Sequence, residues 1–239
     1  MRKKIELLVL LLALAGIYTV SHNLEKYVQS DQVKSVEERQ MDLVVIDSGH
    51  GGSDPGKVGI NEVLEKDINL KISKQVEKEL KNKGYQVVMT REKDQMLVGE
   101  TSGNSKIQDM KARVDLINEK SPGLAVSIHQ NSYHEEAIHG AQVFYYSHSS
   151  EGKIAAKLMQ QALLGADSEN TRQEKANDTY YLLRRTQVPT IIVECGFLSN
   201  QREADLLAGK DYQKKIAEAI ATGIDEYLRN VTDGTWNDK

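Results

Sequence analysis

Two histidines and two glutamates in this sequence have the types and the setting needed for metal-assisted hydrolysis. They are His50, Glu65, His129 and Glu194. Two imidazoles and one carboxylate suit a zinc ion whose fourth position stays open to water, and zinc in such a site lowers the pKa of that water to about 7. A second carboxylate is needed to take up and deliver a proton, and Glu194 is the candidate for that role.

The elements that carry these residues are expected to bring them together. His50, His129 and Glu194 each follow a short apolar run that predicts a buried strand, and Glu65 opens a predicted helix. The three runs cover residues 43–46, 124–128 and 190–193. Ligands of open α/β sheets bind beyond the carboxyl ends of the strands. We therefore expect all four side chains at one rim of a sheet.

Each residue also has a purely structural interpretation. His50 could fill a tight turn among glycines, and Glu65 could interact favourably with a helix N-terminus. His129 could bond its neighbouring loop, whereas Glu194 is costly to bury after an apolar strand without a partner. Cys195 is expected to be a small buried residue rather than a nucleophile. The other histidines are expected in the tether or on the surface: His22, His134, His139 and His148.

Strands and helices alternate along the chain. Apolar residues four apart define helical faces in two segments, at Ile68, Ile72, Val76 and Leu80 and at Ile216, Ile220, Ile224 and Leu228. Further helices are predicted over residues 107–119 and 154–163, and further strands over 85–90 and 141–146. This alternation predicts an α/β fold, a single twisted, mostly parallel sheet with helices on both faces.

The composition is that of a globular domain. Of the 239 residues, 39% are hydrophobic and 28% are charged, with a formal net charge of -4. No large basic field is available, so we expect no nucleic-acid partner. A single cysteine excludes a disulfide framework within the chain. We expect a catalytic domain over residues 41–229, preceded by a polar tether over 21–40 and followed by a polar tail over 230–239.

The first twenty residues are typical of an export segment. Arg2, Lys3 and Lys4 precede an uncharged apolar run from Leu7 to Val20. This run is shorter than the roughly 20 residues that span a membrane comfortably. The sequence therefore predicts export across the cytoplasmic membrane, with residues 1–20 either cleaved as a signal peptide or retained as a membrane anchor.

Six motifs along the chain resemble those of the zinc-dependent N-acetylmuramoyl-L-alanine amidases. In order they are Asp47-Ser48-Gly49-His50-Gly51-Gly52, Asp54-Pro55-Gly56, Glu65-Lys66-Asp67, Thr90-Arg91, Ser127-Ile128-His129-Gln130-Asn131 and Val193-Glu194-Cys195-Gly196-Phe197-Leu198-Ser199-Asn200. The resemblance extends from about residue 43 to residue 227. One departure is Ser48, which stands where the family usually has proline.

The resemblance implies a fold, an activity and a set of site residues. It implies that His50, Glu65 and His129 bind one zinc ion per chain and that Glu194 is the catalytic carboxylate. The bond cleaved would be the amide between N-acetylmuramic acid and L-alanine in peptidoglycan. Arg91 and Asn131 are expected either to contact substrate or to support the rim of the site. Asn131 ends the motif that contains His129. The same metal site could instead serve a zinc peptidase acting within the stem peptide, and the same fold a non-catalytic peptidoglycan-binding module.

Further segments resemble the germination-specific amidases of spore-forming bacteria. They cover residues 113–118 and 140–146, together with the apolar N-terminal segment. This resemblance implies removal of stem peptides so that muramic δ-lactam can form in the spore cortex. No repeat or wall-binding module accompanies the domain, so we expect placement in the spore envelope by an N-terminal segment that contacts the membrane and by a protein partner that aids activity.

Overall fold

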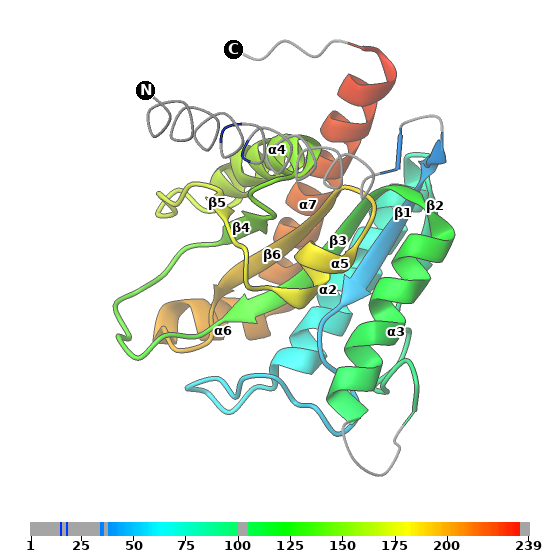
Figure 1. The fold of residues 1–239 in the computed structure, drawn as a ribbon. Coiled ribbons are helices and arrows are strands. Elements are labelled where there is room, and N and C mark those ends of the chain that lie inside the picture. The colour runs from blue at the N-terminus through cyan, green and yellow to red at the C-terminus, as the bar shows by residue number, and fades with distance from the viewer. Residues whose placement is uncertain (1–14, 16–17, 19–33, 36–37, 100–104, 235–239) are drawn as a thin grey trace, which may run out of the picture.

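A six-stranded sheet forms the centre of the domain (Figure 1). The computed structural model describes residues 15, 18, 34–35, 38–99 and 105–234. The strands are β1 (Gln40–Ser48), β2 (Gln86–Met89), β3 (Pro122–Asn131), β4 (Gln142–Tyr145), β5 (Lys175–Ala176) and β6 (Thr190–Phe197). The helices are α2 (Glu65–Asn82), α3 (Ser105–Lys120), α4 (Ser150–Ala166), α5 (Tyr181–Arg185), α6 (Gln201–Ala208) and α7 (Lys210–Thr232). The predicted α/β fold is confirmed.

The sheet is mostly parallel, with one change of direction. The strand order is β2-β1-β3-β6-β4-β5, and β2, β1, β3 and β6 run parallel to one another. β4 is antiparallel to β6, and β5 follows the direction of β4. Residues 132–141, between β3 and β4, form no helix that could carry the chain back to the other end of the sheet. The chain therefore enters β4 from the same end at which it leaves β3, which reverses the strand.

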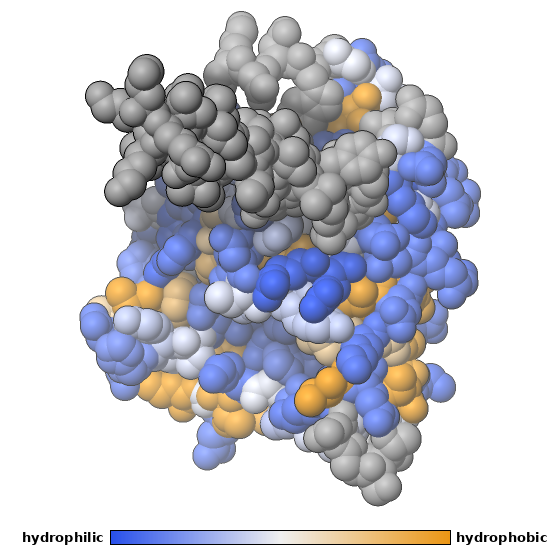
Figure 2. All heavy atoms as spheres, viewed as in Figure 1, coloured by the Kyte–Doolittle hydropathy of each residue, from blue (hydrophilic) through white to orange (hydrophobic). Residues whose placement is uncertain are grey.

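Helices cover both faces of the sheet. α2, α4 and α7 lie on one face, and α3 and α5 lie on the other (Figure 1). The periodic apolar residues of α2 and α7 are all buried against the sheet, as predicted. Neighbouring residues of β1 point to opposite faces, so Val44 joins the core under α2, α4 and α7, and Val45 the core under α3 and α5. The described surface on the α3 and α5 face is largely hydrophilic (Figure 2).

The folded part of the chain begins before the predicted boundary at residue 41. Arg39 is buried, and its Nη2 lies 2.7 Å from Oε1 of Glu151 on α4. Lys34 donates from its backbone N–H to the carbonyl of Gln187 at 2.8 Å. Through these contacts, the described residues at the end of the predicted tether pack against the domain. At the other end, α7 continues to Thr232 rather than stopping near Arg229.

The predicted signal or anchor over residues 1–20 lies outside the described residues except at positions 15 and 18. Within the described residues, no helix is both long enough and apolar enough to cross a membrane. Most of the tether over 21–40, and the tail from 235, also lie outside the described part of the chain.

Candidate active site

The register of the sheet brings three of the predicted site residues to one rim. β1, β3 and β6 are adjacent and parallel, so their carboxyl ends lie side by side. At this rim His129 on β3 and Glu194 on β6 are directly paired across the strands, and His50 follows the end of β1. Glu65 is the first residue of α2, which begins at the same end of the sheet (Figure 1). All four predicted residues therefore meet at the carboxyl end of the parallel strands.

His50 lies in the loop after β1, whose backbone conformation requires glycine at nearby positions. His50 has a φ of 61°, in the left-handed region that non-glycine residues rarely adopt. A Cβ at Gly49 would lie 2.3 Å from Cε1 of His129. Gly56 has a φ of 68°, and a Cβ there would lie 2.5 Å from Oε2 of Glu65. Glycine at these two positions lets the backbone pass directly against the histidine and glutamate side chains.

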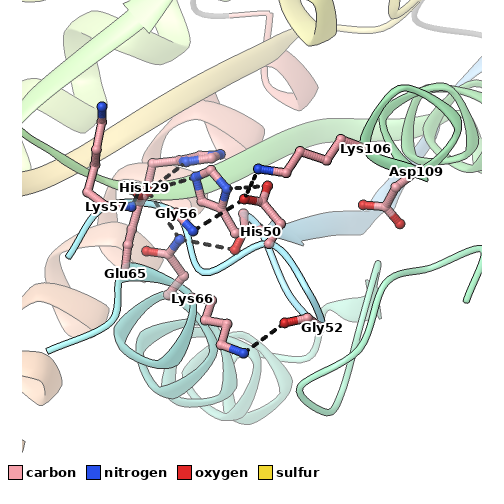
Figure 3. Close-up of polar contacts among 12 residues, drawn as sticks. His50, Gly52, Gly56, Lys57, Glu65, Lys66, Lys106, Asp109 and His129 are labelled. Atoms are coloured by element: carbon pink, nitrogen blue, oxygen red, sulfur yellow. Dashed lines mark hydrogen bonds and ion pairs between the residues drawn. The ribbon is translucent and has the colours of Figure 1, made fainter. Parts of the chain in front are cut away.

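The carboxylate of Glu65 contacts both imidazole rings, which also pack edge to face against each other with centroids 4.9 Å apart (Figure 3). Its Oε1 is 3.2 Å from Nε2 of His50 and 3.0 Å from Nδ1 of His129. Its carboxylate also accepts hydrogen bonds from the backbone N–H groups of Lys57, at 2.7 Å, and Gln130, at 3.1 Å. One possible ligand atom from each member of the histidine–glutamate–histidine cluster lies within 4.8 Å of the others. The cluster could hold a metal ion, and its donor atoms are those that zinc prefers.

The charges of this cluster stabilise one another. Burial raises the pKa of Glu65, but hydrogen bonds and charges from His129 and His50 outweigh burial and hold that pKa well below its usual range. Burial lowers the pKa of His129, yet the hydrogen bond and charge of Glu65 raise it to about 9. In the metal-free protein Glu65 is therefore ionised and His129 is protonated at neutral pH. A metal ion would have to displace that proton, because only a neutral imidazole binds a metal.

Glu194 is a buried carboxyl group with an unpaired oxygen. The residue is 8% exposed, and its Oε2 has no hydrogen-bond partner among the described residues. Burial raises the pKa of Glu194 to about 7. The charge of His129 lowers this pKa and the charge of Glu65 raises it, but burial is the largest effect. A carboxyl group with such a pKa can both accept and deliver a proton near neutral pH. The neighbouring Cys195 is fully buried, and burial raises the pKa of its thiol, which disfavours a nucleophilic role.

A polar cleft opens over the cluster. Its walls are formed by His50, Asp54, Gly56, Lys57, Glu65, Lys106, His129, Gln130, Asn131, Ser132, Tyr180 and Glu194. The candidate metal ligands and Glu194 therefore face the same space. A substrate bound there could reach the metal position and the carboxyl group together.

Several cleft residues were missed by the sequence analysis, among them Asp54 and Tyr180. Asp54 Oδ2 lies 2.8 Å from Nδ1 of His50, so this carboxylate orients the ring with its other nitrogen toward Glu65. The sequence feature that could have identified Asp54 is its position four residues after His50, at the start of the Asp54-Pro55-Gly56 motif. Tyr180, in the segment before α5, lines the cleft beside Glu194. No periodicity or motif marked Tyr180, because it reaches the site only through the packing of α5.

Arg91 and Asn131 occupy different positions. Arg91 is 2% exposed and donates hydrogen bonds to backbone carbonyls only, those of Ser48, Gly49, Lys66 and Lys93. These contacts place the Arg91 guanidinium against the backbone of the loop after β1, and both expected roles, substrate contact and support of the rim, stay predictions. Asn131, at the end of β3, lines the cleft itself, and its Oδ1 accepts from the backbone N–H of Ser132 at 2.8 Å.

The arrangement of fold and site agrees with a known family. A family model described as N-acetylmuramoyl-L-alanine amidase matches residues 44–226, from β1 to α7. The chain belongs to this family. Membership in the N-acetylmuramoyl-L-alanine amidases confirms the resemblance found in the sequence motifs and supports amidase activity on peptidoglycan.

Individual relatives agree with this family in sequence and in fold. The chain is 39% identical over 194 residues to the germination-specific N-acetylmuramoyl-L-alanine amidase of Bacillus subtilis (strain 168), covering 80% of this chain and 81% of that protein. The CwlD amidase of Clostridioides difficile, solved in complex with the GerS lipoprotein, matches with a TM-score of 0.75 and 36% identity, covering 78% of this chain and 98% of that one. The catalytic domain of the CwlV amidase of Bacillus (Paenibacillus) polymyxa var. colistinus matches with a TM-score of 0.69 and 33% identity, over 78% of this chain and 98% of that one.

Proposed function

We propose that this amidase is a zinc enzyme that hydrolyses the amide between N-acetylmuramic acid and L-alanine. The observation that carries the proposal is one polar cleft that holds the cluster of His50, Glu65 and His129 together with the buried Glu194. In this cleft His50, Glu65 and His129 would hold one zinc ion per chain. Zinc supplies a Lewis acid that polarises the scissile carbonyl and makes a water molecule more acidic.

The residues of the chain then divide the work of hydrolysis. Asp54 and the backbone N–H groups around Glu65 hold the ligands in orientation, which preserves the open side of the site toward the cleft. Glu194 takes a proton from the attacking water and delivers it to the amine of the leaving L-alanine. Its pKa near neutrality and its unpaired Oε2 support both halves of that transfer.

We propose that the substrate is the peptidoglycan of the spore cortex. Removal of stem peptides there would leave bare muramic acid residues for δ-lactam formation. The support is the 39% identity to an amidase whose name marks it as germination-specific. The enzyme would then act outside the cytoplasmic membrane, in the spore envelope, with residues 1–20 serving as its export signal or anchor.

A protein partner is part of this proposal. The part of the chain that the structure describes contains the catalytic elements and no added wall-binding unit. The related CwlD amidase was solved in complex with a lipoprotein, which supports the idea of a partner that aids activity or placement.

The deciding experiment is mass spectrometry of cortex peptidoglycan treated with the zinc-loaded full chain, beside the Glu194→Gln variant. We expect free peptides that begin at L-alanine from the wild type. The variant should retain zinc and lose turnover by about 10²- to 10⁴-fold. Glu135→Gln, an exposed glutamate in the loop after β3, is the matched control and should cleave normally.

Other outcomes identify the competing functions. Cuts within the stem peptide would indicate a zinc peptidase. Binding to peptidoglycan without products, with or without a partner lipoprotein, would indicate a non-catalytic wall-binding module. Wild-type turnover by Glu194→Gln would remove Glu194 from the mechanism.

A further inference from the structure

One wall of the cleft presents a lysine whose charge has no partner. Lys57 lines the cleft and is exposed. Within the described residues its ammonium group forms no ion pair or hydrogen bond. Its backbone, in contrast, is fixed, because the N–H of Lys57 donates to Oε2 of Glu65 at 2.7 Å. The lysine therefore extends from a backbone position that is tied directly to a candidate metal ligand.

The other basic groups of the cleft are already engaged. Lys106 Nζ lies close to Oδ1 of Asp54, at 2.6 Å, and both histidines contact Glu65. In Figure 3 Lys106 approaches His50 from one side, while the Lys57 side chain extends away from Glu65 on the other. Among the cations that line the cleft, Lys57 is the one left to interact with a bound molecule.

This cation fits an acidic ligand. Resting on the proposed function, the bound molecule is a stem peptide whose first residue is L-alanine, and a carboxylate on the residue that follows would give Lys57 an acidic partner. That carboxylate would lie one residue from the scissile amide, and Lys57 lines the same cleft as the candidate metal ligands and Glu194. A lysine ammonium is a compact charge that pairs readily with a carboxylate.

We propose that Lys57 forms a carboxylate-binding subsite and makes the enzyme prefer stem peptides with a free carboxylate next to L-alanine over their carboxamide forms. Lys57 is then a specificity-determining residue. Its contribution lies in substrate binding, because the ammonium group pairs with a part of the substrate that does not react.

The test compares two soluble muropeptides that differ only at the residue after L-alanine, carrying either a carboxylate or a carboxamide. We expect the wild-type full chain to have the lower KM for the carboxylate form. Lys57→Ala should raise that KM about three- to fivefold and leave kcat and the KM of the carboxamide form unchanged. Lys57→Glu should raise it by at least about tenfold, because two like charges then face each other. Lys153→Ala, at an exposed lysine on α4, is the control and should behave as the wild type.

The outcomes separate this proposal from the function on which it rests. If Lys57→Ala changes the KM of both muropeptides equally, or changes kcat alone, the proposal of a carboxylate-binding subsite is wrong. The proposed amidase activity is not affected by that result. If the wild type releases no peptide that begins at L-alanine from either muropeptide, the proposed function fails and the subsite fails with it. Zinc content and circular dichroism are measured for each variant to check that the lysine substitutions leave metal binding and folding intact.

Discussion

Arg113 on α3 and Asp47 at the end of β1 form a buried ion pair, with 2.7 Å between Nη1 and Oδ1 and both side chains 2% exposed. The same guanidinium group donates to the backbone carbonyls of Ser48 and His50, both at 2.8 Å, and to Asp109 at 2.7 Å. Arg113 therefore joins a helix on one face of the sheet to the loop that presents a candidate metal ligand.

Removal of Arg113 should cost much more stability than removal of a surface arginine. Arg113→Ala leaves Asp47 buried without its counter-charge, so we expect a loss of about 3–5 kcal/mol in the free energy of unfolding. Arg229→Ala removes an exposed guanidinium from Asp225, which keeps Lys83 and Tyr85 as partners, and should cost much less stability. Chemical denaturation of both variants measures the difference. A loss for Arg113→Ala as small as that for Arg229→Ala would contradict the role of the buried pair.

Asp47 should make the stability of the domain fall in acid. Burial raises its pKa, but Arg113 and hydrogen bonds from Ser127 and Thr90 outweigh burial and lower it to about 2. The carboxylate is thus favoured in the folded state, so its contribution is present above the unfolded pKa of about 4 and is lost as pH falls toward about 2. We expect a loss on the order of 2 kcal/mol across this range. Unfolding measured from pH 5 to pH 2 should show a weaker pH dependence for Asp47→Asn than for the wild type, and equal slopes would refute the assignment.

Asp54 should control metal affinity through His50. Because its carboxylate fixes the orientation of the imidazole, Asp54→Ala should weaken zinc binding about 10- to 100-fold. Lys106→Ala removes the lysine partner of Asp54 and keeps the contact with His50, so it serves as the matched control. Competition with a zinc chelator gives both affinities. If the two variants bind zinc equally well, Asp54 does not act through His50.

Zinc binding should release a proton at neutral pH. Glu65 raises the pKa of His129 to about 9, so the metal-free imidazole is protonated at pH 7.5 and must lose its proton to bind zinc. Affinity should therefore rise with pH up to about 9 and become less pH-dependent above it. Calorimetric titration in two buffers with different ionisation enthalpies measures the protons released. His134→Ala, at an exposed histidine, should release the same number as the wild type, and heats independent of the buffer would contradict the prediction.

Much of the fold followed from local pattern. The continuous apolar runs in β1, β3 and β6, and the four-residue spacing in α2 and α7, reflect burial on both faces of a strand or on one face of a helix. Each pattern involves residues close together in the sequence, so these strands and helices could be predicted without knowledge of the tertiary structure. The short elements β5, α5 and α6 were missed, because two to eight residues carry too little periodicity to be recognised.

The sequence alone indicated which residues are the candidates for the chemistry, because His50, His129 and Glu194 each follow an apolar run that predicts a strand and Glu65 opens a predicted helix. Only the tertiary structure decided what surrounds them. The contacts of Asp54 with His50, of Arg113 with Asp47, and the place of Lys57 and Tyr180 in the cleft depend on how loops and helices distant in sequence pack together. Such contacts are long-range and are made by single side chains, so no periodic pattern records them.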